Sequence, residues 1–191
     1  AGMAINSNTG EISWMPQQAQ AGTDGESPLV CQSDSPGIGT IDPVIKWEWT
    51  GSSIKPSYYH VIMTPVVAQT NDDNGDGNID DNDYPDVIFT SYDLSNAPNN
   101  RPPGYLRIVS GSDGSLLTSN EDYQLDGYAQ IAVGDIDGDS LIEIVTTKWH
   151  GGGVYVFEHD GTFKWEATTN TPDYSGSISI ADLDGDGSVE I

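Results

Sequence analysis

The sequence has very little positive charge. Its 191 residues include 6 Lys and Arg against 30 Asp and Glu, which gives a formal net charge of −24. Proteins that bind nucleic acid or anionic membrane surfaces need clustered Lys and Arg. The composition therefore excludes both classes of partner and indicates a cationic one.

Cysteine and long apolar runs are also scarce. Cys31 is the single cysteine, so neither a disulfide framework nor a tetrahedral zinc site is available, and we expect a thiol that is unpaired or whose partner is missing. No apolar run approaches the roughly 20 residues of a membrane-spanning helix. No basic and then apolar leader opens the chain. We expect no membrane insertion, and a secretion signal that lies outside these residues.

The acidic residues are concentrated in three short windows, 72–86, 135–143 and 182–190, which contain half of them and no Lys or Arg. Aromatic and β-branched residues recur around the windows in short alternating runs. Wholly disordered acidic segments lack such runs, so we expect most of the chain to fold.

A repeat connects these windows. Residues 64–92, 129–149 and 177–191 each contain a short apolar strand, an acidic loop with glycine, and a second apolar strand. Aligning Asp86, Glu143 and Glu190 gives spacings of 57 and 47 residues. These spacings suit the four-stranded blade of a β-propeller, which typically takes ~40 to 50 residues.

Two hairpins fill the space between the acidic loops. Residues 105–119 and 153–167 each read as strand, turn, strand, with Asp-Gly at 113–114 and 160–161. Asp-Gly between alternating apolar residues is a strong hairpin signal, so these aspartates are predicted to form turns. No segment predicts a helix, because Pro and Gly interrupt the chain too often.

The spacing of the acids predicts calcium ligands in the last two windows. In a loop that curls around a cation, side chains at positions 1, 3 and 5 point inward, position 7 offers its carbonyl, and a later carboxylate closes the shell. Oxygen ligands of this kind suit Ca²⁺ better than zinc or copper. The predicted ligands are Asp135, Asp137, Asp139, the Leu141 carbonyl and Glu143, and then Asp182, Asp184, Asp186, the Ser188 carbonyl and Glu190.

The first window has a longer loop. Residues 72–83 fit the pattern of an EF-hand calcium loop, with strands instead of helices on both sides. Its twelfth residue is Asp instead of the usual Glu, so Asp86 either replaces Asp83 or joins it. We expect about three calcium sites in all, with simple solvated turns as the alternative. The predicted ligands here are Asp72, Asn74, Asp76, the Asn78 carbonyl, Asp80, Asp83 and Asp86.

These motifs carry a family resemblance. "IAVGDIDGDSLIEIV" and "ISIADLDGDGSVEI" resemble the FG-GAP or VCBS repeats of integrin-type β-propellers, whose D-x-D-G-D-x-x-x-D/E loops bind calcium between the first two strands of a blade. The resemblance extends over about residues 58–191 and implies an extracellular adhesion or surface protein. Some bacterial relatives are carbohydrate-active enzymes.

The beginning of the chain has a different character. Residues 2–22 resemble a stretch of bacterial Ig-like domains, with Thr9-Gly10 at a turn, and 23–43 read as a linker rich in Gly, Ser, Pro and Asp. We therefore expect a partial Ig-like hairpin (1–22), a linker (23–43) and propeller-type repeats (44–191), in which "VIKWEW" (44–49) could supply the outer strand of a blade.

The predicted fold class is all-β, with four-stranded antiparallel blades, calcium loops and an incomplete propeller. About two and a half blades can be recognised, whereas closed propellers need ~4 to 8. Either the chain is a piece of a longer polypeptide, or neighbouring copies complete the sheet edges, which favours self-association and a fibre.

The resulting hypothesis is a secreted or cell-surface, calcium-binding repeat protein with an adhesion or structural role and an unknown protein or glycan ligand. The rival is a carbohydrate-active, lyase-like enzyme, for which no catalytic motif is present. A polysaccharide lyase assay would separate the two. The candidate bases of such an enzyme are scattered over strand ends: His60, Arg107, Lys148, His150 and His159.

Overall fold

A computed structural model describes residues 3–5, 12–14, 44–96, 101–150, 152–168 and 176–191. The chain divides into two units, Ala1–Val44 and Ile45–Ile191. In the first unit, β1 (Met3–Ile5) and β2 (Ile12–Trp14) form an antiparallel pair. The linker predicted at 23–43 and Cys31 lie outside the described residues, and the Ig-like assignment of 1–22 stays a prediction.

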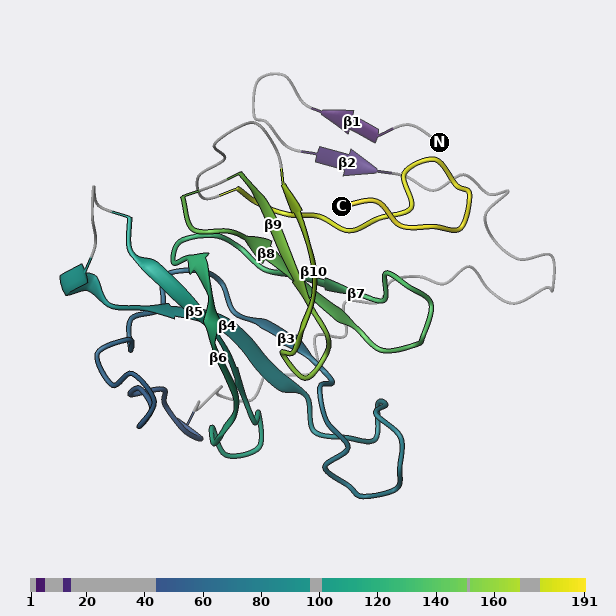
Figure 1. Ribbon diagram of the computed structural model, residues 1–191. Helices are drawn as coiled ribbons and strands as arrows, with labels where there is room; N and C mark the ends of the chain where they lie inside the picture. The colour runs from purple at the N-terminus through teal and green to yellow at the C-terminus, as the bar shows by residue number, and fades with distance from the viewer. Residues whose placement is uncertain (1–2, 6–11, 15–43, 97–100, 151, 169–175) are drawn as a thin grey trace. The chain divides into compact units, whose positions relative to one another are not determined.

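The second unit contains two four-stranded antiparallel sheets, and in each of them consecutive strands pair (Figure 1). The described residues contain one short 3-10 helix, η2 (Leu94–Asn96), and no helix that could span a membrane. The all-β, four-stranded prediction is confirmed. The first sheet consists of β3 (Val66–Ala68), β4 (Asp86–Tyr92), β5 (Pro103–Val109) and β6 (Leu116–Asp126), and the second of β7 (Ala132–Gly134), β8 (Glu143–Thr147), β9 (Gly153–Phe157) and β10 (Phe163–Thr168).

Two equivalent hairpins, β5–β6 and β9–β10, form the outer halves of the sheets. Asp113 and Asp160 each accept the amide of the residue two positions later, at 2.9 Å, so both are turn formers as predicted. Beyond each turn the strand register shifts by one residue. The extra residue of this β-bulge is Leu117 in β6 and Lys164 in β10.

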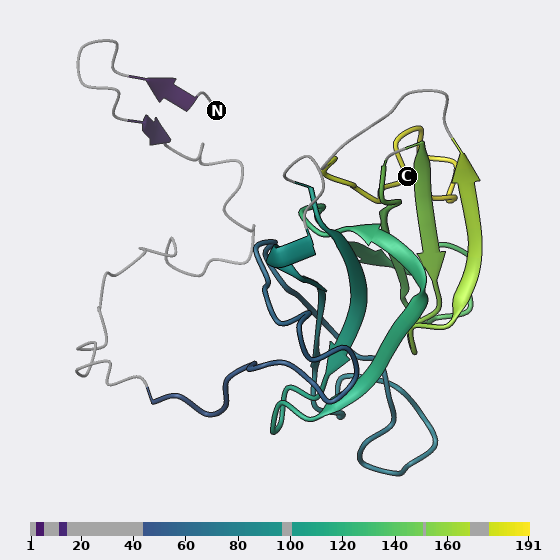
Figure 2. The ribbon, with the colours of Figure 1, turned by 60° about the vertical axis from the view of Figure 1, so that its left-hand side comes forward.

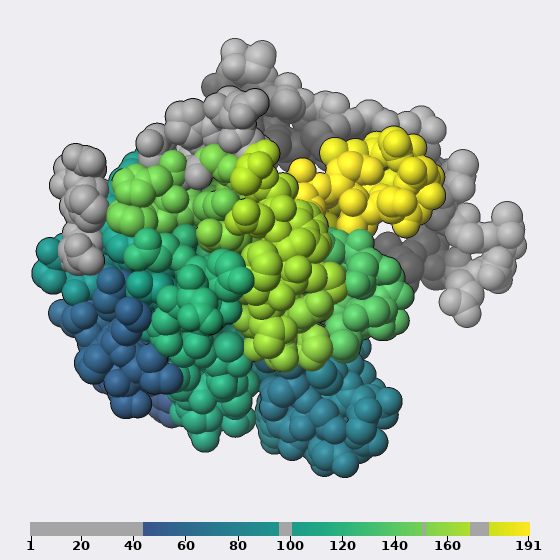
Figure 3. Space-filling view, in the orientation of Figure 1, coloured from purple at the N-terminus to yellow at the C-terminus, as the bar shows by residue number. Residues whose placement is uncertain are grey.

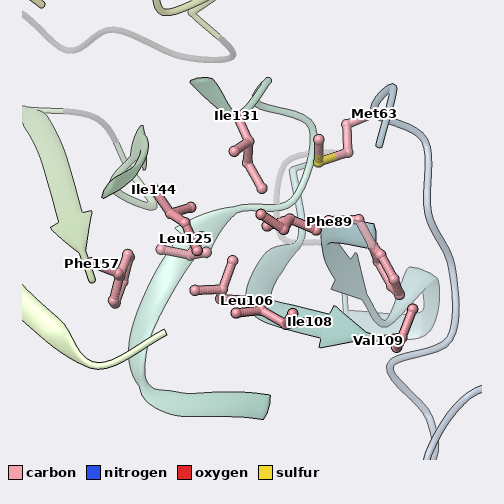
Figure 4. Close-up of a cluster of buried hydrophobic side chains, with 10 residues drawn as sticks. Met63, Phe89, Leu106, Ile108, Val109, Leu125, Ile131, Ile144 and Phe157 are labelled. Atoms are coloured by element: carbon pink, nitrogen blue, oxygen red, sulfur yellow. The ribbon is translucent and has the colours of Figure 1, made fainter. Parts of the chain in front are cut away.

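One hydrophobic core joins the two sheets. Side chains from β4, β5 and β6 pack with Ile144 of β8 and Phe157 of β9 in a single buried cluster, and the sheets face each other across it (Figures 2 and 4). Burial of apolar area on this scale is the main stabilising contribution in a β-rich domain. The buried members are Met63, Ile88, Phe89, Leu106, Ile108, Val109, Leu125, Ile131, Ile144 and Phe157.

The segment at 44–49 is not the strand that its alternating residues predict. Residues 44–50 have no regular secondary structure. Trp47 and Trp49 pack against the core cluster, and Trp47 donates its indole N–H to the carbonyl of Gly111 at 3.1 Å. The physical reason is that β6 already provides the fourth strand of the first sheet. The two tryptophans contribute apolar surface instead of a strand edge.

Replacing Ile144 with Ala should destabilise both sheets together. Ile144 is fully buried in the shared core, and such a truncation costs about 2–5 kcal/mol. Urea unfolding followed by tryptophan fluorescence and circular dichroism should give one transition at a lower midpoint. Val67→Ala is the control, because Val67 is 59% exposed and a change of less than about 0.5 kcal/mol is expected there. Separate transitions for the two signals would contradict a shared core.

Candidate calcium-binding loops

The second unit contains three acidic loops, each of which follows a short strand or an isolated β-bridge. Loop 1 (69–85) joins β3 to β4 and projects from the sheets (Figures 1 and 3). Loop 2 (135–142) joins β7 to β8. Loop 3 (182–189) lies between Ala181 and Glu190, which pair in an isolated antiparallel bridge. Positions below are counted from Asp72, Asp135 and Asp182.

The three loops share one hydrogen-bond framework. The carboxylate at position 1 accepts the amides of positions 4 and 6, one with each oxygen, at 2.6–3.0 Å. The side-chain oxygens at positions 3 and 5 each accept the amide two residues later, at 2.8–3.3 Å. The same framework therefore orients all nine side chains at positions 1, 3 and 5. Eight of them are carboxylates, and the ninth is the amide of Asn74.

This framework requires a left-handed backbone at two positions. Position 4 is glycine in every loop, and position 6 is Gly77, Ser140 or Gly187. Ser140 has φ = +75°, close to the +92° of the two glycines at the same position. A side chain in this region carries a steric cost that glycine avoids.

We expect Ser140→Gly to stabilise the protein. Relief of the left-handed strain, about 1–2 kcal/mol, exceeds the extra chain entropy of glycine in the unfolded state, about 0.5–1 kcal/mol. The net gain should be up to about 1 kcal/mol in a urea melt. The reverse change, Gly187→Ser, is the matched control and should destabilise by a similar amount. A Ser140→Gly protein of unchanged or lower stability would contradict this account.

The acid that closes each loop is identified by a further hydrogen bond. Glu143 accepts the amide of position 2 in loop 2 at 2.8 Å, and Glu190 does the same in loop 3 at 2.7 Å. In loop 1 the amide of position 2 is bound by Asp83, at 3.2 Å. Asp83 also accepts the amides of Asn74 and Asp80. Asp83 is therefore the closing acid of loop 1.

Asp86 has a different environment. It opens β4 and pairs with Ala68, as Glu143 opens β8 and pairs with Gly134. Its side chain is fully buried, and Thr70 donates its hydroxyl to Oδ2 at 2.5 Å. The strand register thus aligns Asp86 with Glu143, but the loop-closing contact belongs to Asp83. Burial raises the pKa of Asp86, and the hydrogen bond from Thr70 opposes this only in part.

In chelator-containing buffer, Asp86→Asn should raise the melting temperature near neutral pH. The pKa of Asp86 is higher in the folded than in the unfolded chain, so charging this group costs stability as the pH rises from its unfolded pKa of about 3.9 to its folded pKa. The advantage of Asn should disappear below about pH 4. Melting temperatures of the Asp86→Asn and parent proteins, measured from below about pH 4 to neutral pH, test this prediction. A less stable Asp86→Asn protein at neutral pH would indicate that the carboxylate has a cationic partner.

The acids of loops 2 and 3 are arranged to fit a metal ion. Asp135, Asp137 and Glu143 each offer an oxygen, all within 4.8 Å of one another. Asp182, Asp184 and Glu190 do the same in loop 3. An all-carboxylate set of this kind suits a hard divalent cation such as Ca²⁺.

Other predicted ligands are not gathered in this way. In the part of the chain that the structure describes, loop 1 has no comparable group of three acids, and Asp186 belongs to none. Asp139 is grouped with Glu143 and Glu158. Asp80 accepts two hydrogen bonds from Asn82. The carbonyl ligands predicted at Asn78, Leu141 and Ser188 stay predictions.

Two residues that the sequence motif did not reveal lie beside loop 2. Lys164 Nζ lies 2.7 Å from Asp137, 3.2 Å from Glu143 and 2.9 Å from Glu158. Asp137 and then Glu158 raise the pKa of this ammonium, and it lowers the pKa of Asp137. No loop motif includes Lys164 or Glu158, because a neighbouring hairpin brings them to the loop.

The five candidate bases of an enzyme are absent from the lining of two cavities of the second unit. One cavity of about 860 Å³ lies between loop 1 and loop 2, and another of about 330 Å³ lies beside Trp47 and Trp49. None of the five bases lines either one. His60 stacks on aromatic rings, and the ring of His150 lies tilted against that of Trp149. Lys148 pairs with Glu166, and buried Arg107 pairs with Glu121. His159 lies in the turn between β9 and β10.

Comparison with known proteins supports the repeat assignment. Residues 135–191, which contain loops 2 and 3, match the FG-GAP-like repeat family. The crystal structure of the V. cholerae biofilm matrix protein Bap1 is similar, with 36% sequence identity and a TM-score of 0.69. The match covers 76% of this chain and 24% of that one. No curated protein matches the sequence. The resemblance to FG-GAP repeats is confirmed.

Proposed function

We propose that this chain is a calcium-stabilised module of an extracellular matrix or surface protein, with an adhesion or structural role. The observation that carries the proposal is the common framework of the three loops, two of which bring three carboxylates within 4.8 Å of one another. A solvated turn needs no such convergence, because like charges a few ångströms apart repel.

The acids of loops 2 and 3 have two structural roles. Asp135 and Asp182 hold the loop backbone with both carboxylate oxygens. Glu143 and Glu190 hold the amide at position 2 and begin the following strand or bridge. Bound calcium supplies the positive charge that lets these acids remain close. Each loop thereby ties its two strand ends together.

The charge and the comparisons support an extracellular location. A net charge of −24 favours an environment rich in divalent cations, and calcium sites of extracellular modules have dissociation constants of about 10⁻⁴–10⁻³ M. The similar crystal structure is of a biofilm matrix protein. Because the match covers 24% of that chain, the ligand of the whole protein, whether protein or glycan, is not assigned from it.

A structural role is favoured over catalysis. Four of the five candidate bases are used in ring contacts or ion pairs, and none of the five lines either cavity. Half of the 30 acids lie in the three loop windows, where several of them hold the loop backbone and are not free for catalysis.

Calcium should raise the melting temperature and bind with measurable heat. At a free concentration of 100 times the dissociation constant, each site adds about 2.7 kcal/mol to the stability. Asp184→Asn should remove the contribution of loop 3. Asp113→Asn is the matched control, since it removes the same charge from a hairpin turn and should leave binding unchanged. The proposal would be overturned if calorimetry detected no heat of calcium binding and calcium left the melting temperature unchanged.

A further inference from the structure

Lys164 reaches loop 2 because of the β-bulge in β10. The bulge places an extra residue opposite Phe157 and Val156, and a residue in such a position can be turned away from the normal alternation of the strand. The ammonium contacts acids from three segments: Asp137 in the loop, Glu143 of β8 and Glu158 just after β9. Only 16% of the Lys164 side chain is exposed.

The first sheet has the same bulge without the lysine. Leu116 pairs with Val109 and Thr118 with Ile108, so Leu117 is the equivalent of Lys164. Leu117 is 40% exposed and carries no charge. The bulge is thus a shared feature of the two hairpins, whereas a cationic residue occupies the bulge position only in the second of these sheets.

The ammonium and a metal ion would use two of the same carboxylates. Asp137 and Glu143 belong to the group of three acids that fits an ion, and both also bind Lys164. Glu143 is fully buried and binds the amide of Ile136 with its other oxygen. A buried carboxylate needs a cation or several hydrogen bonds close by. Two cations held this close by the same acids repel each other, so we expect one of them to leave when the other binds.

We propose that Lys164 is the resident cation of loop 2. Its ammonium holds Asp137 and Glu143 together until calcium displaces it toward Glu158. Glu158 is suited to receive the ammonium, because both of its oxygens lie 2.9 Å from Nζ and it is outside the group of Asp135, Asp137 and Glu143. The inference rests on the proposed calcium function. It implies weaker calcium binding in loop 2 than in loop 3, where no Lys or Arg of the described residues pairs with the acids.

The first test compares Lys164→Met with Lys148→Met in the full chain. Lys148 is a matched control because it pairs with Glu166, away from the loops. Asp76→Ala in loop 1 and Asp184→Ala in loop 3 are added to both proteins, so that calorimetry measures calcium binding at loop 2 alone. Lys164→Met should bind calcium at least about tenfold more tightly than the same background with Lys164. It should also melt at a lower temperature in EDTA, and calcium should restore its stability. Lys148→Met should leave the affinity unchanged.

A second measurement follows calcium binding in the unaltered chain and uses a conservative variant only to assign one signal. Lysines labelled with ¹³C at Cε give separate NMR signals, and the Lys164 signal is identified by its loss in Lys164→Arg. Saturating calcium should shift the Lys164 signal and leave that of Lys148 in place.

The possible failures are distinguishable. Calcium binding with equal affinity in the Lys164→Met and parent proteins, or an unmoved Lys164 signal while calcium binds elsewhere, overturns the exchange alone. Absence of calcium heat in every folded protein overturns the exchange and the proposed function together.

Discussion

The loops depend on the two hydrogen bonds that the first aspartate of each one accepts from its own backbone. With one oxygen on the amide of position 4 and the other on that of position 6, the carboxylate holds the loop in a single conformation. The left-handed residues, the inward direction of positions 3 and 5, and the approach of the closing acid all follow from this contact. Because the acceptor is charged, each of these bonds is stronger than one between neutral groups.

The same contact explains why loop 1 can be longer without losing its framework. Asp72, Gly75 and Gly77 reproduce the arrangement of the shorter loops. The extra residues come after it, and they move the strand away from the closing position. Asp83 then binds the loop amide while Asp86 begins the strand. In loop 2, Glu143 performs both tasks.

Features that depend on local sequence could be predicted. Acid spacing and glycine located the loops, and Asp-Gly at 113–114 and 160–161 located the two hairpins. Features that depend on contacts between distant segments could not be predicted. Alternation in "VIKWEW" resembles a strand, yet Trp47 and Trp49 pack against the core cluster without forming one. The choice between Asp83 and Asp86 required the loop hydrogen bonds, and the position of Lys164 required a bulge, which leaves no mark in residue periodicity.

The acid that begins the strand or bridge after each loop has a different environment in each repeat. Asp86 is buried with a threonine hydroxyl as its partner, Glu143 is buried against an ammonium, and Glu190 is only half-buried. Burial of a charge is costly unless it is paired, so these environments place different demands on a cation. The hydrogen-bond framework of positions 1, 3 and 5 is the same in all three loops and therefore does not distinguish them. What distinguishes them is the neighbouring residue that balances the closing or strand-opening carboxylate, and that residue lies outside the repeat motif.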